Sequence, residues 1–536
     1  MKYVVQVAAL CLICGFTLFS NRGALNLDVM EARNIISARE MVKYHNWLIP
    51  TLNGEVRIAK PPLPTWVTSL FVKGAGSDED LAALRFPAGL AALLMVLWVY
   101  GISFRLTDDR RVPFLSAAVL ASSALLMFMG RNVSWDIFCH MFMAGAIWAL
   151  LIGWGKTKGA SGVFILAGLF MGLSFMSKGP VSFHSMLLPF LLSYLFSFGY
   201  KPIAIKWKGT LLAVFICLII SGLWPLYIYF QLPAVSLATA STEVGSWFPS
   251  HAKPFWHYLQ FPAFSGIWTI FILSALVYPH ARKKVDTFGK NYTFLFTWMG
   301  LTVLLLSAIP KKSTHYLLPV LVPMSLMIGF YIRYLMAAFE QRQQTRGDTV
   351  VVAIHVLVIT SVSFCIPWLF YYYGRRSDLL TFVELLIYSI LFIGIGFLLL
   401  KSYREQKVFK IVLNSILFLS FSCLLIPPVA GKLTPQRRFM ALMECRKKPE
   451  IEQLELYSLP GMDPKEIWAV GRRVRAVDPL NLKLRSLNLP AALFSKTHPD
   501  QLRQEKESEN VSIQFLEVFN DKKKSETWYL SIIDNE

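Results

Sequence analysis

Long apolar runs constrain this chain more than any other feature. About thirteen stretches carry few charges over roughly 17–25 residues, the length at which an α-helix crosses a bilayer. The first runs from Tyr3 to Phe19, and the others are centred near Leu93, Val119, Ala146, Leu169, Leu188, Cys217, Leu273, Leu301, Met324, Ile359, Phe392 and Leu417. Charged residues make up 16% of the chain, against about 25% in soluble proteins. The sequence therefore predicts a polytopic α-helical membrane protein with about thirteen transmembrane helices.

The basic residues lie mostly in the links between these runs. A net charge of +20 would suggest nucleic acid binding in a soluble protein, but here it sets orientation, because cytoplasmic links are enriched in Lys and Arg. If the N-terminus is cytoplasmic, every second link is basic: 106–111, 154–159, 200–209, 280–290, 340–348 and 401–410. The 20–80 loop then lies outside. Lys178, Lys311 and Lys312 also fall in outer links, against the usual bias, and an anionic phosphate partner would explain them.

The composition changes near residue 431. Residues 1–430 are expected to form the transmembrane domain, and residues 431–536 are polar and mixed. Apolar residues in 513–520 and 527–533 follow patterns typical of short strands. Because an odd number of spans places the C-terminus outside, we expect a small extracytoplasmic α/β domain there.

A polar stretch from Leu27 to Trp66 interrupts the apolar pattern. Asp28 and Glu31 form a D-x-x-E pattern that predicts a helix start, with the helix running to about Tyr44. Two interpretations stay open. Either these carboxylates only cap an amphipathic helix that lies flat on the membrane, or they are catalytic and Arg33 binds phosphate beside them.

The rest of this stretch predicts a turn and a fixed cation. Asn53-Gly54 is typical of a tight turn. Pro61-Pro62 restricts the backbone beside Lys60, and such a fixed cation suits a diphosphate or a lipid phosphate. Anchoring to lipid headgroups is the alternative.

Several motifs in chain order carry a resemblance to a known family. They are E-A-R-N-x-x-x-A-R-E-M from Glu31, W-L-I-P-x-L-N-G-x-x-R-x-x-K-P-P-L-x-x-W from Trp47, R-N-x-S-x-D-x-F from Arg131, S-K-G-P from Ser177, W-P-L-Y from Trp224 and K-K-S-T-H-Y-L-L-P-x-x-x-P from Lys311. Over about residues 1–330 the chain resembles bacterial aminoarabinose transferases and their relatives, the protein O-mannosyltransferases. These are GT-C glycosyltransferases that use polyprenyl-phosphate-linked sugars.

The resemblance implies a GT-C fold, a position in the bacterial inner membrane and an active site on the periplasmic side. It implies an undecaprenyl-phosphate-linked sugar as donor and lipid A or another envelope molecule as acceptor, with the enzyme acting as a monomer among membrane lipids. No cofactor is required, although a divalent metal is conceivable. A protein O-glycosyltransferase is the alternative on the same scaffold. A lipid transporter is a third alternative, disfavoured because no internal repeat is visible.

The candidate site residues divide by role. The candidate catalytic carboxylates are Asp28, Glu31 and Asp136. The candidate ligands of the donor phosphate are Arg33, Arg57, Lys60, Lys178, Lys311, Lys312, His315 and Tyr316. The resemblance also suggests that Glu243 contacts the sugar or the acceptor.

Simpler roles stay open for part of this set. Asp136 begins a span, where the helix dipole stabilises an acidic residue, and His315 and Tyr316 could anchor a span end. One departure from the family matters: Met30 occupies the position where relatives usually carry the catalytic Asp. The acidic role then moves to Asp28, or to Glu31 and Asp136, or activity is lost.

Overall fold

The chain divides into two compact units, which are described separately. The computed structural model describes residues 3–156, 159–245, 253–277, 289–433, 437–477, 487–506, 511–519 and 527–535. The first unit comprises Met1–Leu25, Ile58–Pro64 and Leu81–Leu433. The second comprises Asn26–Arg57, Thr65–Asp80 and Thr434–Glu536. In this division unit 1 ends at Leu433, and most of the 20–80 loop groups with the C-terminal residues and not with the spans.

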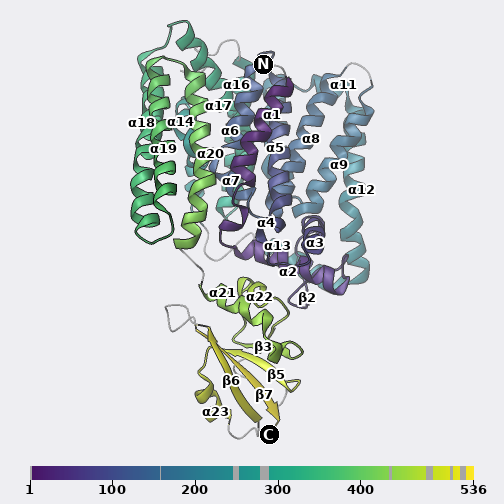
Figure 1. Ribbon diagram of the computed structural model, residues 1–536. Helices are drawn as coiled ribbons and strands as arrows, with labels where there is room; N and C mark the ends of the chain where they lie inside the picture. The colour runs from purple at the N-terminus through teal and green to yellow at the C-terminus, as the bar shows by residue number, and fades with distance from the viewer. Residues whose placement is uncertain are drawn as a thin grey trace. The chain divides into compact units, whose positions relative to one another are not determined.

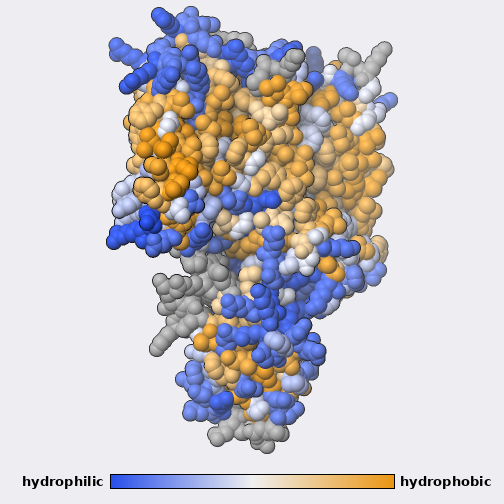
Figure 2. All heavy atoms as spheres, in the orientation of Figure 1, coloured by the Kyte–Doolittle hydropathy of each residue, from blue (hydrophilic) through white to orange (hydrophobic). Residues whose placement is uncertain are grey.

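The first unit is a bundle of long apolar helices (Figure 1). Eleven helical segments among the described residues are long and apolar enough to cross a membrane: Tyr3–Ala24, Leu81–Leu106, Trp135–Gly155, Ser161–Lys178, Trp207–Gln231, Phe255–Ala275, Gly289–Ala308, Thr314–Glu340, Arg346–Arg375, Phe382–Arg404 and Val408–Lys432. Hydrophobic residues cover the middle of this bundle and hydrophilic residues gather at its ends (Figure 2). Such a band is what a membrane-spanning protein presents to lipid.

The individual elements of the first unit follow the chain. They are α1 Tyr3–Cys14, η1 Gly15–Phe19, η2 Arg22–Ala24, α4 Leu81–Leu84, α5 Phe86–Leu106, α6 Arg111–Ala121, α7 Ala124–Met129, α8 Trp135–Gly155, α9 Ser161–Lys178, η3 Phe183–Leu187, α10 Leu188–Phe198, α11 Lys201–Ile205, α12 Trp207–Gln231, α13 Pro233–Gly245, η4 Phe255–Trp268, α14 Thr269–Ala275, α16 Gly289–Ala308, η6 Thr314–Val320, α17 Leu321–Glu340, α18 Arg346–Leu369, η7 Phe370–Arg375, α19 Phe382–Arg404 and α20 Val408–Leu433.

Two of the expected spans form shorter apolar helices in the structure. The run near Val119 gives α6 and then α7, because the helix ends at Ser122, whose hydroxyl donates back to the carbonyl of Ala118. The run near Leu188 gives η3 and α10, which together cover Phe183–Phe198. The expected thirteen spans therefore appear, within the described ranges, as eleven long helical segments and two shorter ones.

The second unit combines helices of the polar stretch with a C-terminal sheet. Its elements are α2 Val29–Tyr44, β1 Thr51–Leu52, β2 Glu55–Val56, most of α3 Leu63–Ala75, α21 Arg437–Glu444, η8 Cys445–Lys447, η9 Pro449–Ile451, β3 Glu455–Leu459, α22 Pro464–Val470, β4 Arg475–Ala476, β5 Ala491–Ser495, α23 Pro499–Lys506, β6 Val511–Phe519 and β7 Trp528–Asn535. The five-stranded sheet has the order β4-β3-β5-β7-β6. Strand β3 pairs in parallel with β4 and β5, whereas β7 is antiparallel to β5 and β6.

The C-terminal sheet confirms the expected α/β domain. The apolar segments of the sequence become the neighbouring strands β6 and β7. Leu493, Ile513 and Ile533 lie together in the core. Leu493 lies in β5, which is buried along its whole length, whereas β6 and β7 have both buried and exposed residues. Burial of these apolar side chains against one another stabilises the domain.

The predicted hairpin turn is also present. Strands β1 and β2 are joined by Asn53 and Gly54, whose φ angles are 57° and 87°. Two successive positive φ angles define the tight turn that suits a two-residue hairpin, and Asn-Gly is the preferred sequence for it.

Candidate active site

A buried ion pair lies where α8 begins and α9 ends. These consecutive helices pack against each other in antiparallel fashion, so the first turn of α8 and the last turn of α9 meet at one end of the bundle. Lys178 Nζ donates to Asp136 Oδ1 over 2.5 Å. The two side chains are only 5% and 4% exposed. The structure thus joins two candidates that the sequence placed in separate outer links.

A third segment, η6, completes the cluster around this pair. His315 Nε2 lies 3.9 Å from Asp136 Oδ2, and Lys178 Nζ lies 5.0 Å from the ring centre of Tyr316. A hydrogen bond of 2.9 Å joins Ser313 Oγ to His315 Nδ1, which orients the imidazole. A carboxylate, an ammonium, an imidazole and an aromatic face therefore converge.

A second histidine supports the cluster from the side of α8, and sequence reasoning missed it. His140 Nδ1 donates to the backbone carbonyl of Asp136 over 2.8 Å, and its Nε2 lies 3.4 Å from Ser185 Oγ. Its position four residues after Asp136, on the same helix face, is the signal that could have revealed it.

Lys60 forms a second, more open ion pair in the same unit. Its Nζ lies 2.6 Å from Glu243 Oε2 on α13. These side chains are 20% and 36% exposed, so solvent and solutes reach them. Lys60 and Glu243, expected to contact phosphate and sugar or acceptor respectively, are therefore partners of each other.

Lys312 is engaged by the backbone around it. Its Nζ donates to the carbonyls of Ile309 and Lys253 over 2.8 and 3.2 Å. Burial lowers the pKa of this ammonium below its usual range. The side chain thus secures the segment that leads into η6, and its expected role as a phosphate ligand stays a prediction, as does that of Lys311.

The remaining candidates belong to the second unit. Asp28 caps α2, because its Oδ1 accepts from the backbone N–H of Glu31 over 2.8 Å, as the D-x-x-E pattern predicted. Glu31 is fully buried, and Arg33 Nη1 lies 3.7 Å from the sulfur of Met30. The backbone N–H of Arg57 donates to Pro50, which closes the base of the hairpin. Catalytic and phosphate-binding roles for these four residues stay predictions.

The apolar face of α2 that carries Ile35 and Ala38 is covered by protein. Within the second unit α2 packs on α22. Ser69 on α3 donates to the carbonyl of Ala38, and Asn34 donates to Thr68 and accepts from Thr65. Ile35 and Ala38 are fully buried. The interpretation of α2 as a helix lying flat on lipid is therefore wrong for this face.

Comparison with known proteins finds the same fold and a partial family match. Residues 59–224 match the model of the family described as dolichyl-phosphate-mannose-protein mannosyltransferase. The structure matches the crystal structure of ArnT from Cupriavidus metallidurans bound to undecaprenyl phosphate, with a TM-score of 0.72, 15% identity and coverage of 98% of this chain and 97% of that one. The chain therefore has the fold of ArnT.

The chain is also similar to curated bacterial transferases. The chain is 26% identical over 317 residues to the undecaprenyl phosphate-alpha-4-amino-4-deoxy-L-arabinose arabinosyl transferase of Edwardsiella ictaluri, covering 57% of this chain and 55% of that relative. It is 25% identical over 390 residues to the enzyme of the same name from Enterobacter sp., covering 67% of this chain and 65% of that relative. The matched part of the chain thus spans 55% of the length of the first relative and 65% of the length of the second.

No cluster typical of a metal centre is found within the described residues. No group of three or more His, Cys, Asp or Glu side chains there could hold an ion. His251, which the sequence places in the long loop before η4, lies outside the described residues.

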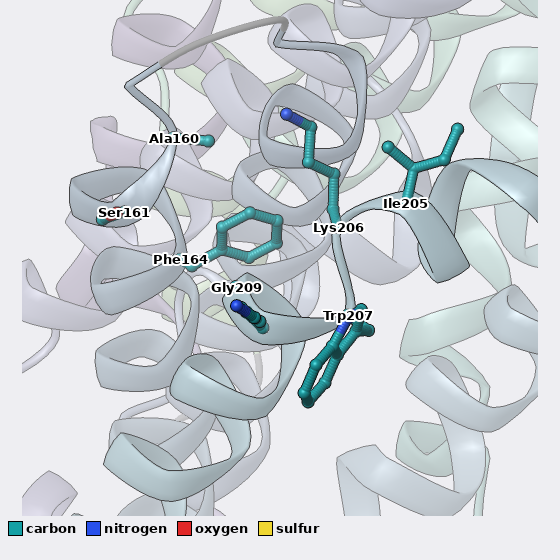
Figure 3. Close-up of a pocket in the computed structure, with 8 residues that line it drawn as sticks. Ala160, Ser161, Phe164, Ile205, Lys206, Trp207 and Gly209 are labelled. Carbon is teal, nitrogen blue, oxygen red and sulfur yellow. The ribbon is translucent and has the colours of Figure 1, made fainter.

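A separate hollow of about 290 Å³ lies at the other end of the bundle. It is lined by the start of α9 and by residues around the start of α12, among them Phe164, Lys206, Trp207 and Lys208 (Figure 3). Ser161 begins α9 and Lys178 ends it, which separates the hollow from the ion pair by about 25 Å along the helix. Aromatic and basic residues of this kind are typical of membrane interfaces.

Proposed function

We propose that this protein transfers a sugar from a polyprenyl phosphate donor, of the undecaprenyl type, to an acceptor of the bacterial cell envelope. The observation that carries the proposal is the Asp136–Lys178 pair with His315 and Tyr316 beside it. Likeness to ArnT bound to undecaprenyl phosphate supports the donor class. The names of the curated relatives favour an aminoarabinose-like sugar. The resemblance of the sequence motifs to aminoarabinose transferases favours lipid A as acceptor.

Burial of this pair supports a chemical role. Taking two charges out of water costs several kcal/mol per ion, and well-packed apolar residues of similar volume would often be at least as stable. Buried ionisable residues within membrane spans are therefore functional candidates by default. Asp136 and Lys178 meet that description, and the two residues come from different helices.

The reaction we propose is a single displacement at the anomeric carbon. A nucleophilic oxygen of the acceptor forms the new bond, the bond from the anomeric carbon to the phosphate oxygen breaks, and polyprenyl phosphate leaves with the bonding electron pair. The transition state resembles an oxocarbenium ion. One attack from the opposite face inverts the anomeric centre.

Cations stabilise the charge that develops on the leaving phosphate. Lys60 and Lys178 are the favoured candidates, with Arg33, Arg57, Lys311, Lys312, His315 and Tyr316 as further ones. Because Lys60 is paired with Glu243, a phosphate that binds Lys60 competes with that carboxylate. Glu243 is then available to contact the sugar or the acceptor.

The need for a base depends on the acceptor. A hydroxyl acceptor loses its proton during attack, and a positioned carboxylate receives it; Asp136 is the favoured base, with Glu31 and Asp28 as alternatives. A phosphate acceptor on lipid A is already ionised and needs no base. Met30 in place of the usual acidic residue is compatible with such an acceptor.

The proposed setting is the bacterial inner membrane, with the site and the C-terminal domain on the periplasmic side. This sidedness is supported by the alternation of basic links along the sequence. Donor and acceptor are membrane lipids, the protein acts as a monomer, and nucleic acid is not a partner.

Mass spectrometry of lipid A and surface glycolipids tests the proposal. Cells with and without this gene are compared under the same growth conditions. Loss of a sugar-sized mass from lipid A on deletion supports lipid A as acceptor and gives the sugar class. Unchanged lipid A and glycolipids in both strains would contradict that assignment.

A protein acceptor is the second candidate. It is favoured by the family match over residues 59–224, whose description names protein mannosyltransferases. Glycopeptide analysis of envelope proteins from the same two strains distinguishes it: peptides that lose a hexose on deletion favour this candidate, and identical glycopeptides exclude it.

A further inference from the structure

The second unit holds a buried carboxylate that the proposed reaction does not use. Glu40 lies on α2 and is 1% exposed. Its Oε2 accepts from Thr51 Oγ1 over 2.5 Å, and the backbone N–H of Gly54 lies 3.1 and 3.2 Å from its two oxygens. Glu40 therefore ties α2 to the β1–β2 hairpin and its turn.

An arginine from the C-terminal domain completes this arrangement. Arg473 Nε lies 3.3 Å from Glu40 Oε1, and its guanidinium carbon lies 3.7 Å from the ring centre of Tyr44. A methyl group placed on Gly54 would approach Arg473 to 3.3 Å. Arg473 is thus packed between the last turn of α2 and the hairpin turn.

The neighbouring residue grips the same turn through its backbone. Asn53 Nδ2 donates to the carbonyl of Val474 over 2.6 Å, and the N–H of Val474 donates to Asn53 Oδ1 over 2.8 Å. Two reciprocal hydrogen bonds of this kind imitate one rung of a β-ladder. We call Glu40, Asn53, Arg473 and Val474 the clamp.

A second anchor lies at Asp78, which follows α3 in the same unit. Asp78 accepts from Arg446 over 2.6 Å and from Arg39 over 3.0 Å. The indole N–H of Trp468 donates to the backbone carbonyl of Asp78 over 3.0 Å. Residues before and after the hairpin are therefore both fastened to the C-terminal domain.

These contacts fix where the hairpin lies and not what shape it has. An Asn-Gly turn forms with its own φ angles and needs no outside partner. Burying the Glu40 carboxylate is expensive, and its pair with the partly exposed Arg473 adds little net stability. The clamp therefore serves position, because its groups come from segments more than four hundred residues apart in the sequence.

We propose that the C-terminal domain is a positioning element of the transferase, and that Asn53 and Arg473 are its positioning residues. The clamped hairpin continues in the chain from α2, which carries Glu31 and Arg33, and it ends four residues before Lys60. When the clamp holds the hairpin, it restricts the backbone of α2 before the hairpin and of the segment that leads to Lys60 after it. This inference rests on the proposed function, since these are the candidate residues for donor binding and catalysis.

The sharpest test is Asn53→Gly in the full-length protein. Glycine accepts the positive φ of this position, so the turn keeps its shape while both hydrogen bonds to Val474 are lost. Arg473→Ala removes the other half of the clamp, and Arg473→Lys is the conservative variant. The matched control is Arg475→Ala, because Arg475 lies two residues further on and its exposed side chain pairs with Glu455 away from the hairpin.

We expect Asn53→Gly and Arg473→Ala each to lower kcat/KM for the donor by about tenfold to a hundredfold, the loss that misplacement by an ångström produces. Donor KM should rise, Arg473→Lys should recover part of the loss, and the double variant should lose less than the product of the single effects. Arg475→Ala should match the wild type. Wild-type kinetics in Asn53→Gly, or equal losses in Arg475→Ala, would overturn the proposal.

Limited trypsin digestion separates this proposal from the proposed function. Cleavage after Arg57 should accelerate in Asn53→Gly and Arg473→Ala and stay slow in Arg475→Ala. If the wild type transfers no sugar from any polyprenyl phosphate donor, the proposed function fails, and digestion alone then judges the clamp. Unchanged cleavage in both clamp variants would overturn it.

Discussion

Two buried carboxylates, Asp136 in the first unit and Glu40 in the second, have opposite surroundings. Both oxygens of Glu40 are occupied, by a hydroxyl, a backbone N–H and a guanidinium. Asp136 Oδ1 accepts from Lys178. Its Oδ2 faces His315 at 3.9 Å, which is beyond hydrogen-bond distance.

The difference separates a carboxylate held for structure from the carboxylate we propose as catalytic. A carboxylate whose oxygens are all occupied has no capacity left to bind a ligand or receive a proton. Among the described residues, Asp136 Oδ2 is held less closely than the Glu40 oxygens, so it is the oxygen that could accept from a substrate. A cation, an imidazole and an aromatic ring lie beside this carboxylate. The same residue chemistry thus serves position in one unit and is suited to catalysis in the other.

The largest effect is expected when the Asp136–Lys178 pair is broken. Lys178→Ala leaves Asp136 buried without its cation, which should lower the free energy of unfolding by about 3–5 kcal/mol and abolish transfer. The double variant Asp136→Asn/Lys178→Met should regain much of that stability and remain inactive. Thermal unfolding in detergent and a transfer assay measure the two properties. A double variant with wild-type transfer would contradict the assignment of the site.

A smaller structural effect and a large functional one are expected at Lys60. Its pair with Glu243 is partly exposed, so Lys60→Ala should change stability by about 0–1 kcal/mol while transfer is lost and membrane insertion is kept. Asp136→Ala should likewise abolish transfer without preventing insertion. The matched control is Lys410→Ala, because Lys410 forms another partly exposed pair, with Glu405, and its loss should leave transfer unchanged. Wild-type activity in both Lys60→Ala and Asp136→Ala would refute the site.

The smallest effect concerns the packing of the second unit. Burial raises the pKa of the Cys445 thiol to about 12, whereas the thiol of an unfolded cysteine has a pKa of about 8.5. At pH 8 the folded thiol is therefore protonated and should resist alkylation. In denaturant the same thiol should react rapidly. Fast labelling of the native wild type would show that this packing is incorrect.

Local sequence signals predicted the local parts of the fold. The helix start at Asp28, the turn at Asn53-Gly54 and strands β6 and β7 each follow from a few adjacent residues. The apolar runs predicted the spans, although the serines that end α6 shortened one of them. Chain order and the alternation of links placed Asp136 and Lys178 on one side of the membrane, which is consistent with their contact.

Long-range pairings could not be predicted in the same way. Arg473 and Glu40 are separated by 433 positions, and nothing near either residue indicates its partner. The C-terminal domain therefore showed no motif on sequence grounds, although it holds the polar stretch. His140 was missed because a buried histidine on an apolar helix resembles ordinary packing until Asp136 is known to be paired one turn away.

A reconstituted transfer assay tests the central claim most directly. The purified full-length protein, in lipid nanodiscs with an undecaprenyl-phosphate-linked sugar and lipid A, is compared with Asp136→Asn/Lys178→Met by mass spectrometry. We predict a sugar-sized mass gain on lipid A and release of undecaprenyl phosphate with the wild type, and neither with the double variant. The same products from both proteins would contradict the claim that the buried pair carries the reaction.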